Sequence, residues 1–147
     1  VIAVNLRGVW LGLKHTLPAI AKRGGGSIVL TSSIAGVRGR EGISAYVASK
    51  HGVIGLMRTA ALEGAPDGVR VNTVNPSPVE TRMMRSLEAG MAPDDPEGLR
   101  ERYASTSPLG RYAEPEEIAK VMLFLASDDS SHCSGSVYMV DGARNAR

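Results

Sequence analysis

The chain has 147 residues, a length that fits a single domain. An apolar content of 43%, a charged content of 22% and a net charge of +2 are ordinary for a soluble globular protein, and they exclude nucleic acid or an acidic membrane as a charge-driven partner. One cysteine, Cys133, excludes an internal disulfide, and the three histidines lack metal-ligand spacing, so no metal site is predicted. No apolar run approaches the ~20 residues of a membrane span and no signal peptide is visible, so a cytoplasmic location is expected.

Hydrophobic periodicity predicts alternating helices and short apolar strands. The triplet Gly24-Gly25-Gly26 precedes a strand, so its expected role is to end the first helix and turn the chain. In chain order we expect helix 1–22, strand 27–31, helix 45–65, strand 69–75, an irregular stretch with short helices to about 109, helix 114–126 and strand 137–140. This alternation predicts an α/β fold with a doubly wound parallel sheet of the Rossmann-like type.

Ser33, Tyr46 and Lys50 form the most informative pattern. Ser33 follows the first predicted strand, and Tyr46 and Lys50 lie one turn apart on one face of the next helix. A phenol normally ionises near pH ~10, and a nearby ammonium favours the phenolate. Such a group can move a proton on or off an alcohol oxygen, which is half of an alcohol oxidation. A Tyr and a Lys at this spacing also occur on ordinary solvated helices, so the surrounding strand, loop and helix are what favour catalysis.

Further sequence motifs occur along the whole chain. They are Val4-Asn5-Leu6-x-Gly8, Thr31-Ser32-Ser33-x-Ala35-Gly36, Tyr46-Val47-Ala48-Ser49-Lys50, Arg70-Val71-Asn72-Thr73-Val74-Asn75-Pro76 with Glu80-Thr81, Pro115-Glu116-Glu117-Ile118-Ala119, and Val140-Asp141-Gly142. On these segments the chain resembles the short-chain dehydrogenase/reductase family of NAD(P)-dependent oxidoreductases, from its first residue to about Ala143.

The resemblance implies a role for each matched residue. Tyr46 is the acid/base and also a cofactor-binding residue, Ser33 holds the substrate oxygen, and Lys50 assists Tyr46 and binds the nicotinamide ribose. Asn5 anchors a water that links Lys50 to solvent, although a helix-interior asparagine can also bond only locally.

The same resemblance identifies a cofactor-binding loop. It includes Pro76, Ser77, Val79 and Thr81, of which Val79 and Thr81 hold the nicotinamide carboxamide. The family usually has glycine where Ser77 stands, and the Cβ of Ser77 is expected to alter the approach of the loop to the cofactor.

A dinucleotide-binding fold carries a Gly-rich turn between its first strand and helix, and no segment of this chain matches that turn. We therefore expect residues 1–147 to be the C-terminal catalytic part of one Rossmann domain, with the first βαβ units upstream of Val1. The choice between NAD and NADP would also be made upstream. Strand 27–31 would lack its neighbour, so the segment alone is expected to be poorly stable and inactive.

Residues 80–107 are expected to form a substrate lid. Its methionines and leucines adapt to irregular apolar surfaces, which favours an apolar, cyclic secondary alcohol or ketone as substrate. The predicted function is NAD(P)-dependent interconversion of that alcohol and ketone. The alternative is a non-catalytic binding or regulatory member of the same fold. The family commonly forms dimers or tetramers. The residues expected to be exposed at such an interface are Trp10, Ala60, Tyr138 and Met139.

Overall fold

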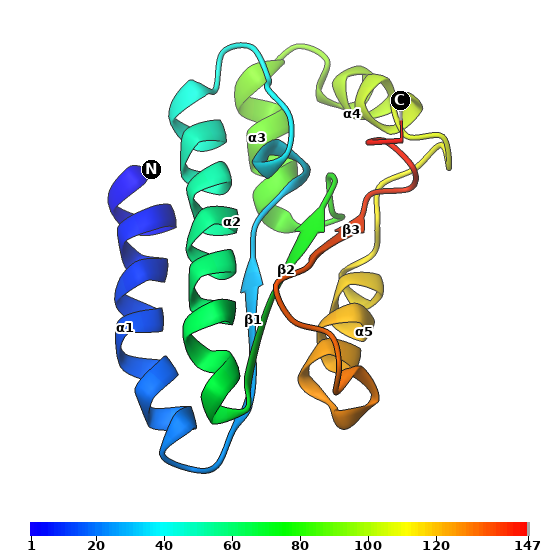
Figure 1. Cartoon of the computed structure of the whole chain (residues 1–147). Coiled ribbons are helices and arrows are strands. Elements are labelled where there is room, and N and C mark those ends of the chain that lie inside the picture. Colours follow the sequence, from blue (N-terminus) through cyan, green and yellow to red (C-terminus); the bar gives the residue numbers. More distant parts are fainter. Residues whose placement is uncertain (147) are drawn as a thin grey trace.

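Three parallel strands form the centre of the molecule, and the computed structural model describes residues 1–146. Strands β1 (Gly26–Thr31), β2 (Val69–Pro76) and β3 (Val137–Val140) pair in the order β1-β2-β3. Helices α1 (Gly8–Ala21) and α2 (Ser44–Gly64) cover one face of the sheet, and α5 (Pro115–Ala126) covers the other (Figure 1). The predicted α/β fold with a doubly wound parallel sheet is confirmed.

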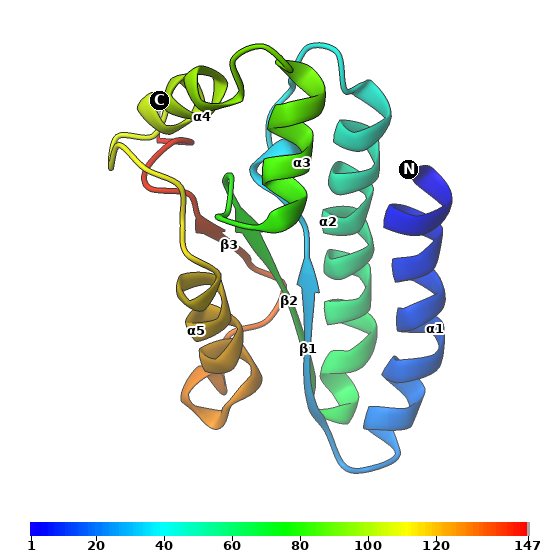
Figure 2. The same cartoon turned by 180° about the vertical axis from the view of Figure 1, so that it is seen from behind.

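Two further helices lie beyond the carboxyl ends of the strands. Helix α3 (Arg82–Met91) and helix α4 (Pro96–Ser105) follow β2 and pack against each other (Figure 2). They occupy the stretch that was expected to be irregular with short helices. Because the strands are parallel, the loops that follow β1, β2 and β3 all emerge at this same edge. The fold therefore places its candidate functional residues under α3 and α4.

The core explains why valines recur along the central strand. Val69, Val71 and Val74 of β2 are almost fully buried, because helices cover both faces of this central strand. Met57 of α2 and Leu125 of α5 pack against these faces from opposite sides and are completely buried.

The element boundaries largely match the expected ones. Gly25 has a φ of 107° and its N–H bonds to the carbonyl of Ile20 over 3.3 Å, so the glycine triplet does end the first helix. Pro115 is the first residue of α5, and Glu114 and Glu117 form a capping box before it.

The first helix and Ala60 differ from expectation. The helix is interrupted by a π-helical turn at Ala3–Arg7, which helical periodicity alone does not reveal. Ala60 is 4% exposed, so the expectation that it lies at an exposed interface is wrong. The residue belongs to the core cluster that includes Met57, because its side of α2 faces the sheet.

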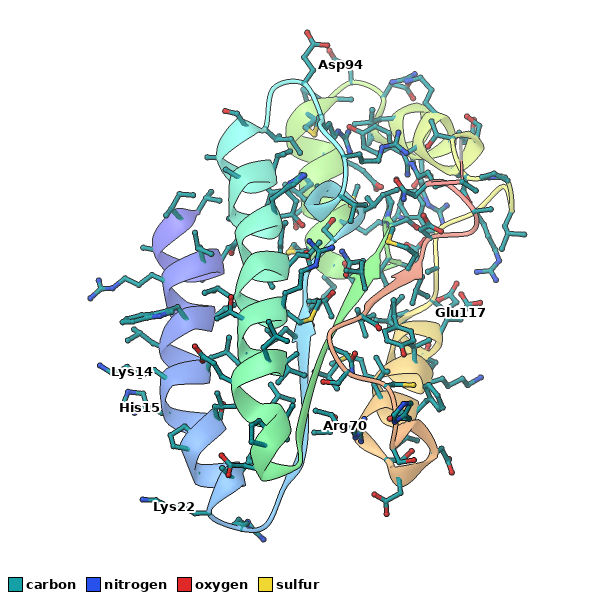
Figure 3. The ribbon with its side chains drawn as sticks, in the orientation of Figure 1. Lys14, His15, Lys22, Arg70, Asp94 and Glu117 are labelled. Carbon is teal, nitrogen blue, oxygen red and sulfur yellow. The ribbon has the colours of Figure 1, made fainter. Side chains whose placement is uncertain are left out.

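Arg70 ties the end of α5 to the sheet. Its guanidinium donates hydrogen bonds to the carbonyl oxygens of Leu125 over 3.1 Å and Ser127 over 2.9 Å, and to Ser130 Oγ over 2.7 Å. Figure 3 shows this side chain between the sheet and the segment after α5, whereas charged side chains of α1 such as Lys14 and Lys22 extend outward. The final loop that leads into β3 is thereby fixed to β2.

Candidate active site

Ser33 lies immediately after β1 and caps a short 3-10 turn at Ile34–Gly36. Its Oγ accepts a hydrogen bond from the N–H of Ala35 over 3.1 Å, which leaves the hydroxyl proton available to donate. The amide Nδ2 of Asn75 donates to the Ser33 carbonyl over 2.8 Å, so β2 holds this backbone in place. Ser33 is therefore a fixed hydroxyl donor at the carboxyl edge of the sheet.

Its neighbour Ser32 has a different environment. Ser32 is 3% exposed, and its Oγ donates to the backbone carbonyl of Lys50 over 3.0 Å. This bond ties the end of β1 to the first turns of α2. The structure thus gives Ser32 a packing role and leaves the hydroxyl of Ser33 free for a ligand.

Tyr46 and Lys50 both come from the beginning of α2. The Nζ of Lys50 lies 5.7 Å from the centre of the Tyr46 ring and donates to the carbonyl of Thr31 over 3.1 Å. An ammonium has three protons, so two remain for other partners. Burial lowers the pKa of Lys50, because a partly desolvated ammonium is less stable than one in water. The structure therefore brings Lys50 to Tyr46 and to the strand end that precedes Ser33.

Asn5 lies in the π-helical turn and faces α2. Its Nδ2 is 3.5 Å from Ser49 Oγ, and that hydroxyl donates to the Tyr46 carbonyl over 2.7 Å. A Cβ on Gly52 would meet the end of the Leu6 side chain at 2.6 Å, so the glycine leaves room for Leu6 where the two helices pack. Within residues 1–146, Asn5 forms no hydrogen bond with Lys50. It is placed against the helix that carries Tyr46 and Lys50, rather than bonding only within its own helix.

The loop after β2 offers backbone and hydroxyl groups to a ligand. Val79 and Ala113 form a parallel β-bridge, in which the Ala113 N–H donates to the Pro78 carbonyl and the Glu80 N–H donates to the Ala113 carbonyl. The N–H and C=O of Val79 itself therefore have no hydrogen-bond partner in the described chain. Thr81 Oγ1 accepts from the N–H of Met84 over 3.2 Å, which leaves its hydroxyl proton free. Pro76 is the last residue of β2. Ser77 is buried, and its N–H donates a hydrogen bond to the Val140 carbonyl over 3.2 Å.

These groups fit a nicotinamide dinucleotide. A carboxamide needs a donor and an acceptor, which the Val79 backbone offers, and ribose hydroxyls can accept from an ammonium such as Lys50. The buried Oδ1 of Asn75 also lacks a hydrogen-bond partner in residues 1–146, beside the same loop. The donor set is thus suited to NAD or NADP on its nicotinamide side.

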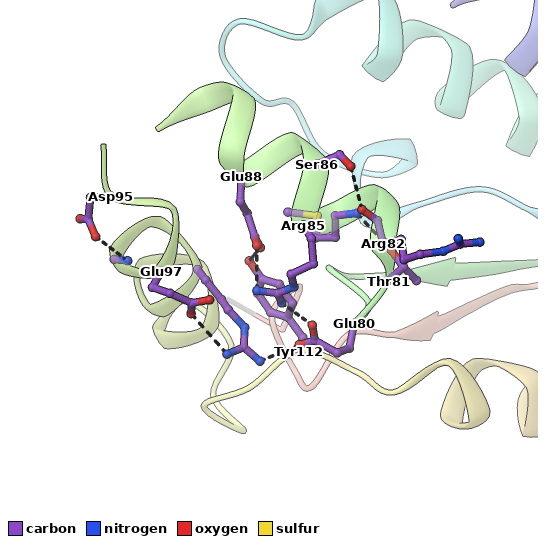
Figure 4. A network of polar contacts seen from close by, with 12 residues as sticks. Glu80, Thr81, Arg82, Arg85, Ser86, Glu88, Asp95, Glu97 and Tyr112 are labelled. Atoms are coloured by element: carbon purple, nitrogen blue, oxygen red, sulfur yellow. Dashed lines mark hydrogen bonds and ion pairs between the residues drawn. The ribbon is translucent and has the colours of Figure 1, made fainter. Parts of the chain in front are cut away.

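A network of ion pairs and hydrogen bonds, with the buried Glu88 among its members, links α3 and α4 (Figure 4). Glu80 forms ion pairs with Arg85 of α3 and, over 2.7 Å, with Arg100 of α4. Arg85 also pairs with Glu88 over 2.8 Å, and the hydroxyl of Tyr112 donates to Glu88 over 2.7 Å. The hydrogen bond from Arg100 lowers the pKa of Glu80. Because Glu80 stands between Val79 and Thr81, this network connects the loop after β2 to α3 and α4.

Sequence reasoning missed this network. The only local signal is the Arg85–Glu88 spacing of three residues, which is common on solvated helix surfaces. Glu88 is 2% exposed and Tyr112 is 5% exposed, so the pair is part of the interior. The pKa of Tyr112 is raised mainly by burial, and to a smaller extent by the hydrogen bond to Glu88.

Replacing Tyr112 with phenylalanine is expected to destabilise the fold. The change leaves a buried Glu88 oxygen without its donor, and the loss should be about 1–3 kcal/mol of unfolding free energy. The raised pKa of Tyr112 means that the contribution of this hydroxyl is complete below about pH 10 and decreases as the pH rises further. Urea unfolding at neutral and alkaline pH measures both effects.

Tyr103→Phe is the matched control. The Tyr103 hydroxyl in α4 forms an exposed hydrogen bond with Arg40, which water can replace, so the change should alter stability by less than about 0.5 kcal/mol. Equal stability of Tyr112→Phe and the unaltered protein at neutral pH would show that the Tyr112–Glu88 bond does not stabilise the packing of α3.

Two absences apply to residues 1–146. No group of three or more potential metal ligands occurs among them, and none of their helices is long and apolar enough to cross a membrane.

Comparison with known proteins identifies the family of this chain. The family profile described as enoyl-(acyl carrier protein) reductase matches residues 1–143. The chain is 44% identical to cyclohexanol dehydrogenase of Acinetobacter sp. (strain SE19) over 147 residues, covering 100% of the chain and 54% of that protein. It is 46% identical to the 3-oxoacyl-[acyl-carrier-protein] reductase FabG of Thermotoga maritima over 142 residues, covering 97% of the chain and 54% of that protein.

The fold also matches a solved structure. Levodione reductase superposes with a TM-score of 0.96 at 39% identity, covering 99% of this chain and 57% of that one. The chain spans about half the length of the curated relatives it matches. Their names describe dehydrogenases and reductases, which supports an oxidoreductase. The chain belongs to the short-chain dehydrogenase/reductase family and corresponds to the C-terminal half of its Rossmann-like fold.

Proposed function

We propose that this chain is the catalytic half of an NAD(P)-dependent oxidoreductase that interconverts a secondary alcohol and a ketone. The observation that carries the proposal is the position of Lys50, whose ammonium lies beside Tyr46 and bonds to the strand end that precedes Ser33. A phenol, a free serine hydroxyl and an ammonium at one edge of the sheet are the groups needed to handle the oxygen of an alcohol.

In the oxidation, Ser33 donates a hydrogen bond to the substrate oxygen and orients the carbinol carbon. Tyr46, as phenolate, takes the hydroxyl proton while the carbon–oxygen double bond forms. The nicotinamide, when bound, accepts the hydride that leaves the carbinol carbon. Lys50 stabilises the phenolate and holds the ribose hydroxyls with its two remaining protons. Asn5 positions a water on the path by which protons pass from Lys50 to solvent.

The lid, residues 80–107, points to an apolar substrate. Met83, Leu87 and Met91 follow one stripe of α3 and are 71%, 48% and 61% exposed. A stripe of this kind, next to the carboxyl edge of the sheet, suits an apolar ring. Two relatives are named for such compounds, cyclohexanol and levodione. We therefore assign a cyclic secondary alcohol or its ketone as substrate class.

The experiment is a turnover assay on the full-length protein that contains this chain. Formation of reduced nicotinamide is measured with NAD and with NADP, using cyclohexanol and the linear primary alcohol hexan-1-ol. Faster oxidation of cyclohexanol is the expected result. No turnover of either alcohol and no reduction of cyclohexanone would contradict the proposed function and favour a non-catalytic member of the fold.

We also propose that the full-length protein is a dimer or tetramer. Val4, Trp10 and Leu62 are 75%, 47% and 79% exposed on the outer side of the helical layer, and uncovered apolar residues of this kind usually mark an interface. Light scattering should give a multiple of the chain mass, and Trp10→Glu should reduce it. A monomer at micromolar concentration would contradict this assembly.

A further inference from the structure

Three arginines from two distant segments meet at the outer end of the lid. Arg38 and Arg40 lie between Ser33 and Tyr46 in the chain, and Arg144 follows β3. The guanidinium of Arg38 donates to the backbone carbonyl of Arg144 over 2.8 Å. Arg40 stacks on the ring of Tyr103 in α4, 4.7 Å from its centre, and donates to the Tyr103 hydroxyl. We call Arg38, Arg40 and Arg144 the arginine cluster.

The position of Arg144 is built into the fold. The carboxylate of Asp141, which is 8% exposed, accepts the N–H groups of Ala143 over 3.1 Å and Asn145 over 2.8 Å. Ala143 has a φ of 65°, in the left-handed region, so the chain turns sharply just before Arg144. Both ribbon views show the segment after β3 ending beside α4 (Figures 1 and 2). The turn therefore holds Arg144 against the lid.

The charge of the cluster is unbalanced within residues 1–146, where none of its three members forms an ion pair. Other arginines nearby are paired with carboxylates. Arg85 and Arg100 pair with Glu80, Arg102 pairs with Asp95, and Arg111 pairs with Glu117. Burial, together with repulsion from Arg40 and Arg38, lowers the pKa of Arg144. An anion placed among the three guanidinium groups would relieve both effects.

The cluster is connected to the proposed reaction centre through the chain. The connection that carries Arg38 and Arg40 begins at Ser33 and ends in the first turn of α2, where Tyr46 lies. The hydrogen bond from Arg40 to Tyr103 joins this connection to α4 of the proposed lid. A substrate held by Ser33 and Tyr46 under the lid would extend toward these guanidinium groups.

We propose that the arginine cluster binds an anionic group, of the carboxylate type, at the far end of the substrate. This inference rests on the proposed function and narrows it. The substrate is then an apolar ring with the reacting hydroxyl or ketone at one end and a carboxylate at the other. The apolar stripe of α3 contacts the ring, and the planar forks of the guanidinium groups bind the carboxylate oxygens.

Calorimetric binding to the full-length protein with saturating NAD tests the cluster directly. The two probes are cyclohexanecarboxylate and cyclohexanecarboxamide, which have similar shapes and differ in charge. The carboxylate should bind about 10-fold more tightly or better, and raised salt should weaken it. NAD is present at saturation so that its own phosphates already occupy their site, and the measured heat then comes from the added carboxylate or carboxamide.

The Arg40→Gln/Arg144→Gln variant should lose this preference. Arg23→Gln is the matched control, because Arg23 is exposed at the opposite end of the sheet, just before β1, and should leave the preference intact. Equal binding of the two probes, or a preference that survives in the double variant, would overturn the proposal.

A kinetic comparison separates this proposal from the proposed function. With trans-4-hydroxycyclohexanecarboxylate, the double variant should lose about 10-fold or more in kcat/KM, whereas its oxidation of cyclohexanol should be nearly unchanged. Failure to oxidise either alcohol, combined with selective carboxylate binding, would refute the reaction and retain the anion site. An equal loss for both alcohols would refute the anion site and retain the reaction.

Discussion

Tyr46→Phe is expected to lower kcat for cyclohexanol oxidation by the full-length protein about 100- to 10,000-fold, the range for loss of a positioned acid/base group. The phenylalanine keeps the ring beside Lys50 and removes only the hydroxyl that would take the substrate proton. The affinity for NAD or NADP should change little, because Lys50 and the loop after β2 remain. Steady-state kinetics and cofactor titration measure the two quantities separately.

The cofactor titration also shows whether the variant is folded. A Tyr46→Phe protein that binds cofactor normally and keeps near-normal turnover would exclude Tyr46 as the acid/base. A protein that loses cofactor binding as well would indicate that the tyrosine supports the fold of the site rather than the proton transfer.

Lys50→Met is expected to have a second large effect, on both turnover and its pH dependence. The change removes the ammonium that favours the phenolate form of Tyr46 and the donor to the ribose, so kcat/KM should fall about 100-fold or more. In the unaltered protein, the lowered pKa of Lys50 predicts that activity declines at alkaline pH as this ammonium loses its proton.

Rate measurements across pH test this prediction, with two comparison variants. Lys50→Arg keeps the charge and should retain more activity than Lys50→Met. Lys22→Met removes an exposed lysine at the end of α1 and should leave the pH profile unchanged. A Lys50→Met profile that superimposes on that of the unaltered protein would show that Lys50 does not act on Tyr46.

Local pattern was sufficient to predict the elements and the spacing of the main site residues. The segment Val69–Pro76, with valines at positions 69, 71 and 74, is predicted as a strand, and these valines are buried because both faces of β2 are covered. Tyr46 and Lys50 share a helix face because they are one turn apart, so their proximity needs no tertiary information. The capping box at Glu114 and the glycine turn before β1 are also local features.

Contacts between distant segments could not be predicted in this way. The bond from Ser32 to the Lys50 carbonyl joins a strand end to a helix, and two adjacent serines are indistinguishable by pattern. Glu88 looks like a solvated helix residue until Tyr112 and Arg85 are folded around it. The arginine cluster depends on the turn at Asp141, which brings the end of the chain to α4.

The central claim is that Ser33, Tyr46 and Lys50 hold one alcohol oxygen and one nicotinamide ribose. The most direct test is a crystal structure of the full-length protein with NAD and cyclohexanone, a pair that cannot exchange a hydride. We predict that the ketone oxygen lies within about 2.6–3.2 Å of both Ser33 Oγ and Tyr46 Oη, with Lys50 Nζ bonded to the ribose hydroxyls. A ketone oxygen bound away from Tyr46, or a ribose out of reach of Lys50, would contradict the account.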